Sequence, residues 1–442
     1  YLIKSTNRGR SWEMITGGLP EKTLVWRITQ DHVNKDLMFL GTEFGLYFTV
    51  DGGDQWIELT GNVPTISFRD VRIQRRENDL VAGSFGRGIF VLDDYTALRS
   101  LNTDTLEASA HLFANAKTPW YRQDTLHSDS QGDDQWVTEN PPFGTTMTYY
   151  LKDTLKSAKD IRVEADKALV EDGQGTIYPD FDTLEAERRE AEPALFVTIK
   201  DASGAVINNV KAENKKGVNR VTWSLRHAPQ TAIITESSGT GGGFYGDPGA
   251  FATPGTYTAT LNARVDGVLS ELTGPVSFDV VDITERALAG APEADRIAFQ
   301  HEVEIAQAAV AAANSTVSDL MNKLKLYRVA MDRASGGASL EGQFETIRAE
   351  LYAIDEALNG KRSQAGTGSR PATITSRVNF AARSSSGTYG PTPQSHEQLG
   401  YAMEAFADVK SRLGTMTGST IPAFEESLVA ADAPWVRGGD LP

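Results

Sequence analysis

The stretch Asp36-Leu-Met-Phe-Leu-Gly-Thr-Glu-Phe-Gly-Leu-Tyr-Phe-Thr49 decides the fold of the first part of the chain. It returns as Asp79-Leu-Val-Ala-Gly-Ser-Phe-Gly-Arg-Gly-Ile-Phe-Val-Leu92, at an offset of 43 residues. Repeats of about 40–50 residues are typical of the four-stranded blades of β-propellers. Residues 1–97 are therefore expected to form the end of one blade and about two more.

A second repeat is interleaved with the first. Ser5-Thr-Asn-Arg-Gly-Arg-Ser-Trp12 and Thr49-Val-Asp-Gly-Gly-Asp-Gln-Trp56 share the spacing S/T-x-D/N-x-G-x-x-W, 44 residues apart. The short Asn or Asp side chain can cap its own turn, glycine supplies the positive φ, and the Trp can fold back over the hairpin. This pattern is the Asp box. It predicts structural roles, and not ligand contacts, for Ser5, Asn7, Gly9, Trp12, Thr49, Asp51, Gly53 and Trp56.

Two or three blades cannot close a ring, and open sheet edges expose unpaired strand groups. The chain also opens inside a strand pattern, without an initiator Met. We therefore expect it to be the C-terminal portion of a larger protein. The remaining blades are expected from sequence upstream of Tyr1 or from another chain.

The rest of the chain is expected to contain a linker, a sandwich and a helical module. Residues 98–143 are interpreted as a linker or strap leaving the propeller. Apolar and alternating runs between turns predict an Ig- or fibronectin-like β-sandwich over 144–284. A charged insertion at 152–192 interrupts this sandwich and is expected to hold a short exposed helix.

Apolar residues near helical spacing predict antiparallel helices over 285–442. The helices are expected at about 292–334, 339–360, 395–413 and 421–431, and a Ser-, Gly- and Thr-rich loop at 361–394. The predicted fold class is therefore multidomain and mainly β, with an α C-terminus.

Composition excludes several classes of function. The chain has 43 Lys and Arg against 59 Asp and Glu, for a formal net charge of −16. That balance argues against binding to nucleic acid phosphates or to anionic lipid. The absence of cysteine excludes disulfides, thiolate catalysis, zinc–thiolate sites and iron–sulfur clusters. The sequence contains no run of 18 apolar residues, so no membrane span is predicted.

Loops that gather on one face of a propeller supply the candidate ligand-binding residues. They are Glu43, Phe44, Arg69, Asp70, Phe85 and Arg87. A glycosidase needs two carboxylates at a defined separation. Glu43 and Asp70 are the best carboxylates available for such a pair on this face. The favoured interpretation is an ion pair of these carboxylates with Arg69 or Arg87 that fixes neighbouring blades. The alternative is one wall of a glycan or peptide site.

Other candidates carry weaker signals. Asp93-Asp94 is interpreted as a cap for the following turn. The tryptophans at 26, 120 and 136 could stack on sugars, but packing is favoured for at least two of them. A solvated acidic loop is favoured over a calcium site for Asp129, Asp133 and Asp134. No metal site, cofactor site or catalytic centre can be assembled from the sequence, which lacks a histidine pair at helical spacing, a G-x-S-x-G elbow and a phosphate loop.

The repeats also resemble a known family. Gly41-Thr-Glu-Phe-Gly-Leu-Tyr47, Val50-Asp-Gly-Gly53 and Phe85-Gly-Arg-Gly-Ile-Phe-Val-Leu-Asp-Asp94 are similar to bacterial sortilin-type Asp-box (BNR) repeat β-propeller proteins, which are often labelled glycosyl hydrolases. Gly217-Val-Asn-Arg-Val-Thr-Trp223 and Pro254-Gly-Thr-Tyr257 resemble the sandwich that follows the propeller in those proteins. The resemblance implies the order propeller end, sandwich and helices, and a secreted or cell-envelope location in a bacterium.

The resemblance implies two functions. Sortilin-like proteins bind ligands on a propeller, so a non-catalytic binding or scaffolding role toward a peptide, protein or glycan is the first expectation. The sandwich and helices would then hold the propeller against a partner subunit or a second copy. The alternative is a xyloglucanase-like glycoside hydrolase, whose catalytic Asp pair matches no residue here and is expected upstream.

Overall fold

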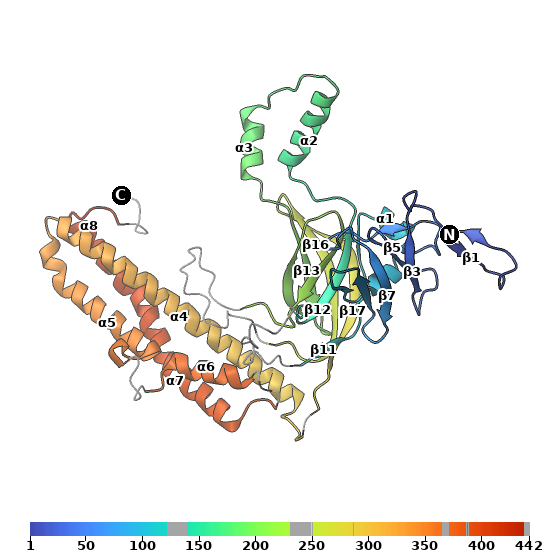
Figure 1. The fold of residues 1–442 in the computed structure, drawn as a ribbon. Helices are drawn as coiled ribbons and strands as arrows, with labels where there is room; N and C mark the ends of the chain where they lie inside the picture. The colour runs from blue at the N-terminus through green and yellow to red at the C-terminus, as the bar shows by residue number, and fades with distance from the viewer. Residues whose placement is uncertain are drawn as a thin grey trace. The chain divides into compact units, whose positions relative to one another are not determined.

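A computed structural model describes residues 1–121, 140–229, 249, 251–285, 287–364, 371–385, 387 and 389–436. Within these residues the chain is mainly β, with several sheets followed by a helical C-terminal region (Figure 1). Two compact units are formed, one by Tyr1–Leu225 with Pro254–Ile283 and the other by Arg226–Thr253 with Thr284–Pro442. The expected sandwich boundary is therefore wrong at 226–253, because the described residues of this segment group with the helices.

The first unit begins with three antiparallel sheets that follow one another along the chain. The first is the two-stranded hairpin of β1 (Ile3–Lys4) and β2 (Glu13–Met14). The second has the order β3 (Val25–Gln30), β4 (Met38–Thr42), β5 (Leu46–Thr49) and β6 (Ile57–Glu58). The third has the order β7 (Phe68–Gln74), β8 (Asp79–Ser84) and β9 (Ile89–Leu92).

The second and third sheets pack on each other through a shared apolar core. Its fully buried aromatic residues include Phe39 and Phe68, which contact Tyr95 and Phe90 edge to face at 5.1 and 5.4 Å between ring centroids. The backbones approach closely at Gly41, where a Cβ atom would lie 2.6 Å from the carbonyl oxygen of Phe68. A larger residue at this position would push the two sheets apart.

The two repeated turns are closed by their own side chains. The Oδ1 atom of Asn7 accepts a hydrogen bond from the backbone N of Ser11 at 2.8 Å, and Oδ1 of Asp51 accepts one from Gln55 at 3.1 Å. Gly53 has a φ of 105°, and a Cβ atom there would lie 2.9 Å from the side chain of Ile15. These are the contacts of a turn cap, as the spacing of the repeat predicts.

The two tryptophans of these turns differ in burial. Trp56 is 3% exposed and donates from Nε1 to the carbonyl oxygen of Ile15 at 2.8 Å, so it packs on the preceding hairpin. Trp12 is 59% exposed. The expectation that the Trp buries its ring is therefore wrong for Trp12, because no described sheet precedes β1 to cover it.

Two further sheets form a sandwich. One has the order β10 (Ala110–Leu112), β12 (Thr145–Leu151) and β15 (Gly217–Trp223). The other has the order β11 (Thr118–Trp120), β17 (Val268–Asp282), β16 (Gly255–Val265), β13 (Ala194–Lys200) and β14 (Val206–Ala212). Trp223 is fully buried between them and contacts Tyr257 and Phe278 of the larger sheet at 5.1 and 6.1 Å.

The interpretation of residues 98–143 as a linker is wrong for their first part. After a 3-10 turn (Thr96–Arg99) and α1 (Thr103–Glu107), the strands β10 and β11 join the two sheets of the sandwich. Strands of three residues are too short to show an alternating pattern, and their partners β12 and β17 lie far along the chain. Residues 122–139, with Asp129, Asp133, Asp134 and Trp136, lie outside the described residues.

The insertion at 152–192 contains two helices where one was expected. They are α2 (Ala158–Glu171), which begins with a capping box formed by Ser157 and Asp160, and α3 (Phe181–Arg189), which begins at the N-cap Asp180. Neither helix has a buried residue, so neither packs an apolar face against a core.

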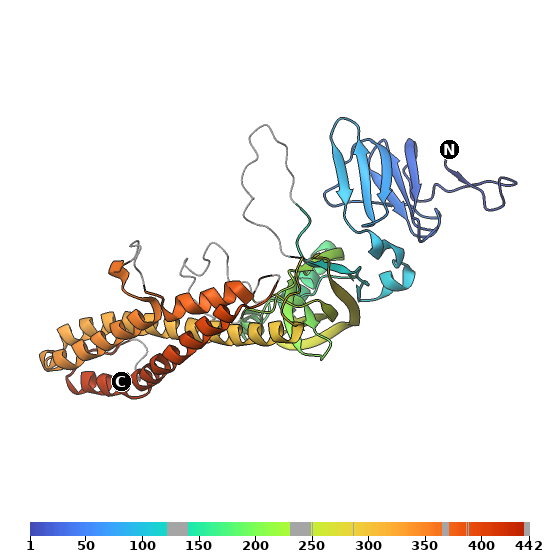
Figure 2. The ribbon, with the colours of Figure 1, turned by 90° about the horizontal axis from the view of Figure 1, so that it is seen from below.

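The second unit is built on the long helix α4 (Glu293–Arg333), along which the other helices pack (Figure 2). They are α5 (Glu341–Asn359), α6 (Ile374–Ser385), α7 (Pro393–Thr415) and α8 (Ile421–Ala430), with a π-helical turn at Met416–Thr420 between the last two. The core includes the fully buried Tyr327, whose hydroxyl donates to Glu425 at 2.5 Å. Among the described residues, no helix is long and apolar enough to span a bilayer.

The expectation of a loop at 361–394 is wrong, because this segment contains α6. The helix buries Ile374, Val378 and Ala381, which follow helical spacing on one side. Their signal is hidden among Ser, Thr and Arg residues, and burial against the bundle stabilises the helix despite that composition.

Candidate functional site

The turns that carry the predicted residues lie at one end of the second and third sheets. The backbone N of Glu43 donates to the carbonyl oxygen of Leu24 at 2.9 Å, and that of Phe85 donates to Ser67 at 2.8 Å. Each turn between the second and third strands of a sheet is thus bonded to the segment that enters its first strand. A further bond from the N of Gly45 to the Ile66 carbonyl at 2.9 Å joins the two sheets at this end.

Arg69 lies at the centre of this face. Its guanidinium carbon is 3.7 Å from the ring centroid of Trp26 and 4.8 Å from that of Phe85. Trp26 and Arg69 occupy equivalent positions of the 43-residue repeat, and each lies at a register shift between its strand and the next. Such bulges redirect a side chain out of the strand. Trp26, one of the three tryptophans considered for sugar stacking or packing, therefore belongs to the surface around Arg69.

The aromatic side chains at this end of the sheets remain open to solvent. Phe44 is 62% exposed, Phe85 is 69% exposed and Trp26 is 38% exposed. Arg87 is also exposed, in the turn between β8 and β9. Exposed aromatic rings grouped with arginine are typical of binding surfaces, because both kinds of side chain offer a large contact area to a partner. We call Trp26, Phe44, Arg69, Phe85 and Arg87 the aromatic–arginine surface.

Asp70 is paired with arginines other than the expected ones. Its Oδ2 atom accepts a hydrogen bond from Nε of Arg72 at 3.1 Å, and its Oδ1 atom lies 3.2 Å from Nε of Arg27. The hydrogen bond from Arg72 and the charges of both arginines lower the pKa of Asp70. The ion pair predicted with Arg69 or Arg87 is therefore wrong for Asp70, because the bulge turns Arg69 toward the two rings instead.

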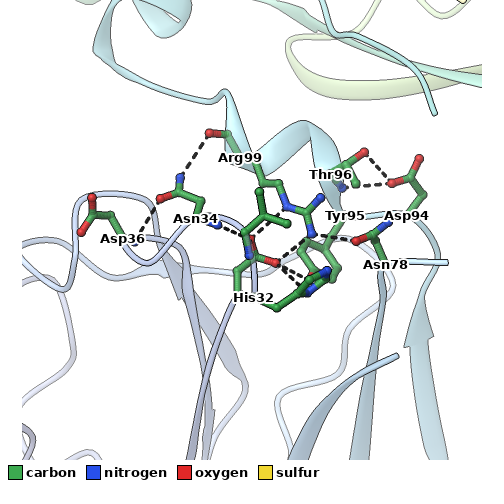
Figure 3. A network of polar contacts seen from close by, with 10 residues as sticks. His32, Asn34, Asp36, Asn78, Asp94, Tyr95, Thr96 and Arg99 are labelled. Atoms are coloured by element: carbon green, nitrogen blue, oxygen red, sulfur yellow. Dashed lines mark hydrogen bonds and ion pairs between the residues drawn. The ribbon is translucent and has the colours of Figure 1, made fainter. Parts of the chain in front are cut away.

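A second polar cluster lies at the opposite end of β3 and is buried (Figure 3). Its centre is Asp31, which accepts hydrogen bonds from Nε and Nη2 of Arg99 at 2.9 Å each and from the hydroxyl of Tyr95 at 2.5 Å. The backbone N atoms of Val33 and Asn34 also donate to this carboxylate, at 3.0 and 2.7 Å.

Burial of Asp31 opposes its ionisation, but the hydrogen bond from Arg99 and the other donors outweigh burial and hold the pKa of this carboxyl well below its usual range. The guanidinium of Arg99 also donates to Oδ1 of Asn78 at 2.7 Å, which ties the second sheet to the third. A carboxylate with so many donors has no free lone pair for a substrate. The cluster is therefore a structural tie.

Asp93 and Asp94 lie where the chain leaves the third sheet. Oδ1 of Asp94 accepts from the backbone N and the hydroxyl of Thr96 at 3.1 and 2.6 Å, which is the geometry of a turn cap. Nη2 of Arg220 donates to the carbonyl oxygens of Asp93 and Asp94 at 2.5 and 2.7 Å. Burial, and then the charge of Asp79, raise the pKa of Asp93.

The remaining candidates do not form a site in the described part of the chain. Trp120 is 5% exposed in β11, so it packs in the sandwich and cannot stack on a sugar. Among the described residues, no group of three or more His, Asp or Glu side chains is placed to hold a metal ion.

Comparisons with known proteins add little. No protein-family model and no curated protein matches the chain. Two solved structures of an extracellular domain from B. thetaiotaomicron align with it, one described as part of a one-component system and one as part of a hybrid two-component system. Each alignment covers 63% of this chain and 28% of the solved chain, with identities of 13% and 12% and TM-scores of 0.17 and 0.16. Scores this low carry no argument about fold or function.

Proposed function

We propose that this chain is the terminal part of an Asp-box β-propeller and that the aromatic–arginine surface binds a ligand without catalysing a reaction. The observation that carries the proposal is the stacking of Arg69 between Trp26 and Phe85 at an exposed end of the sheets. Aromatic faces suit sugar rings and apolar peptide side chains, while a guanidinium edge suits a carboxylate. The ligand class is thus a peptide, protein or glycan.

The propeller assignment is supported by equivalent residues of the repeat. Leu46 and Phe48 of β5 are buried against the third sheet, at 3% and 7% exposure. The residues 43 positions later, Ile89 and Val91 of β9, are 72% and 54% exposed. Among the described residues, no sheet covers this apolar face of the third sheet, as expected where a further blade packs.

We propose that sequence upstream of Tyr1 or another chain supplies that blade. The native mass and the N-terminal sequence of every co-purifying chain test this proposal. A polypeptide that contains Tyr1 internally, or a second chain that remains bound, would support it. A folded monomer of 48.0 kDa that begins at Tyr1 would contradict it.

Binding is favoured over the alternative of a xyloglucanase-like glycoside hydrolase. The general acid of a glycosidase needs a raised pKa and a second carboxylate at defined distance. Asp70, the carboxylate of this face with two arginine partners, has a lowered pKa and so does not suit that role. The alternative therefore depends on a catalytic pair upstream of this chain. An envelope or extracellular location in a bacterium is proposed on the resemblance of the repeats alone.

Arrays of polysaccharides and of short peptides, probed with the complete native protein, test the binding function. The variants Arg69→Ala and Phe85→Ala should weaken binding of any captured probe by about 30-fold or more, as expected for residues at the centre of an interface. The matched control is Val206→Ala, which removes an exposed apolar side chain from β14. Unchanged binding by both site variants would contradict the proposal, as would the release of reducing sugar from a captured polysaccharide.

A further inference from the structure

The third sheet has one strand fewer than the second. In the second sheet β6 pairs with β5, and the backbone N of Leu59 donates to the carbonyl oxygen of Leu46 at 2.8 Å. The first hairpin has the equivalent bond 44 residues earlier, from the N of Ile15 to the carbonyl oxygen of Leu2 at 3.1 Å. The third sheet has the order β7, β8 and β9, and among the described residues no strand lies beyond β9. It therefore lacks the outermost strand of the repeat.

The outer edge of β9 carries unpaired backbone groups. On its inner side, the backbone N of Ser84 donates to the carbonyl oxygen of Gly88 at 3.0 Å. Because the bonds to one neighbour alternate along an antiparallel strand, Ile89 and Val91 turn their peptide groups away from β8. Within the described part of the chain, no group bonds to them there. Each of these two residues thus presents a free N–H donor and a free carbonyl acceptor.

The composition of β9 does not suit an edge that faces solvent. Its sequence is Ile-Phe-Val-Leu, with no charged residue and no proline. Exposed edge strands usually carry such residues, or bulges, which prevent pairing with another strand. The edge strand β14 of the sandwich has Asn208, Asn209 and Lys211, and its pairing with β13 is bulged. By this comparison β9 has the composition of a strand with a neighbour on both sides.

The residues that follow β9 do not supply this neighbour. In the second sheet, the Asp-box turn leads β5 back into β6. After β9 the chain leaves the sheet, since Asp94 has a φ of 39° and the N of Tyr95 donates to the carbonyl oxygen of Asn78 at 3.0 Å. Arg220 of the sandwich then holds the carbonyl oxygens of Asp93 and Asp94. The missing strand therefore has to come from a segment that is not adjacent to β9 in sequence.

A strand this short needs a covalent connection to stay paired. β6 has only two residues, so a strand of its length makes few bonds to its neighbour. The net gain from a few hydrogen bonds does not offset the freedom that a separate chain loses on binding. A segment of the same polypeptide is present at a high effective concentration instead. Two strands precede the pair β5–β6 in the second sheet, and the equivalents of these strands for the pair β1–β2 would precede Tyr1.

We propose that an extended segment of the same polypeptide, upstream of Tyr1, pairs antiparallel with β9 and completes the third sheet. The proposal rests on the proposed function, which places a further blade on the face of this sheet, and it concerns the edge of the same sheet. In the register of β6, one residue of the segment donates its N–H to the carbonyl oxygen of Ile89. That residue is apolar, because Ile15 and Leu59 hold this position in the other two copies and pack against their cores.

Amide hydrogen exchange of the complete native protein tests the pairing. The N–H of Val91 should exchange at least about 100-fold more slowly than in an unfolded chain, as should that of Phe48, the equivalent residue of the second sheet. In the polypeptide of residues 1–442 alone, Phe48 should stay protected while Val91 exchanges fast. Fast exchange at Val91 in the complete native protein overturns the proposal. If the native mass of that protein shows the additional sequence, the proposed function stands despite this result.

A matched pair of variants tests the role of the backbone bond. Val91→Pro removes the N–H at the open edge and Val91→Ala keeps it, while both remove the same apolar side chain. Proline is tolerated in an edge strand where its nitrogen faces outward, so Phe48 should stay protected in both variants.

In the complete native protein, Val91→Pro should make the paired segment at least about 10-fold more susceptible to proteolysis than Val91→Ala does. Mass spectrometry of the released fragments identifies the segment, which should precede Tyr1. Equal susceptibility of the two variants overturns the proposal, as do fragments that come from a separate chain.

Discussion

The second and third sheets of the first unit are two copies of one repeat in different surroundings. In the second sheet, Leu46 and Phe48 are covered by the third sheet, and Trp56 packs on the hairpin before it. In the third sheet, the equivalent Ile89 and Val91 are exposed. The same local sequence pattern therefore produces the same strands, while burial depends on which sheets lie on either side.

The comparison extends to the polar residues at the ends of the sheets. Asp31 of the second sheet is buried and bonded to Arg99 and Tyr95. Its counterpart 43 residues later is Gln74, which accepts a bond from the backbone N of Glu77 at the surface. The strand positions are thus the same in both copies of the repeat. Only the second sheet has the buried carboxylate that binds Arg99 and Tyr95.

The largest predicted effect comes from breaking that tie. Asp31→Asn should lower the free energy of unfolding by about 3–5 kcal/mol, because it removes the fully buried carboxylate charge that pairs with the partly buried guanidinium of Arg99. Gln74→Ala, at the equivalent surface position, should change it by less than about 0.5 kcal/mol. Denaturant unfolding of the complete native protein, followed by tryptophan fluorescence, measures both. Equal stability of the two variants would contradict the assigned role of Asp31.

The same carboxylate should make stability depend on pH. Its pKa is lowered in the folded protein, so its contribution is present above the unfolded value of 3.8 and is lost as the pH falls below that value. Unfolding of the wild type should therefore become easier in acid, and Asp31→Asn should reduce that dependence.

A second prediction compares equivalent apolar residues. Leu46→Ala should destabilise the first unit by about 2–5 kcal/mol, because it removes a buried side chain from the core between the sheets. Ile89→Ala should cost less than about 0.5 kcal/mol in the chain alone. When the proposed neighbouring blade is present, the cost at Ile89 should approach that at Leu46. A small effect at both positions in the assembled protein would argue against a further blade on this face.

The smallest effect is expected for the ion pairs of Asp70, the residue 43 positions after Arg27. Their side chains are 50% and 39% exposed, so Asp70→Asn should cost only about 0.2–1 kcal/mol. Binding by the aromatic–arginine surface should remain within about threefold of the wild type, since Arg69 keeps both of its rings. A loss of binding as large as that of Arg69→Ala would show that Asp70 itself contacts the ligand.

Much of the fold could be predicted from local patterns. The 43-residue period indicated the repeated strands, and helical spacing placed α4, α7 and α8 within a few residues of their ends. Short elements were missed, because three residues of β10 or β11 carry no period and α6 is masked by polar residues. The helices α2 and α3 were incompletely predicted for another reason, since neither buries a residue against a core.

The candidate surface was predicted in part. The loops that meet at one end of the sheets follow from blade topology, so Phe44, Arg69 and Phe85 could be grouped before their contacts were known. Trp26 could have been added from its position in the repeat, since it precedes Arg69 by 43 residues. The partners of Asp70 could not be predicted, because a bulge in β7 decides which side chains face it.

The sequence by itself determined the period of the repeat, the two turns closed by Asn7 and Asp51, the helical C-terminal region and the acidic balance. These are local properties, set by side chains a few residues apart and by composition. Only the tertiary structure decided that Trp56 is buried while Trp12 is exposed, and that Arg69 lies between two rings. Those outcomes depend on contacts between residues 16 to 43 positions apart, whose geometry no local pattern specifies.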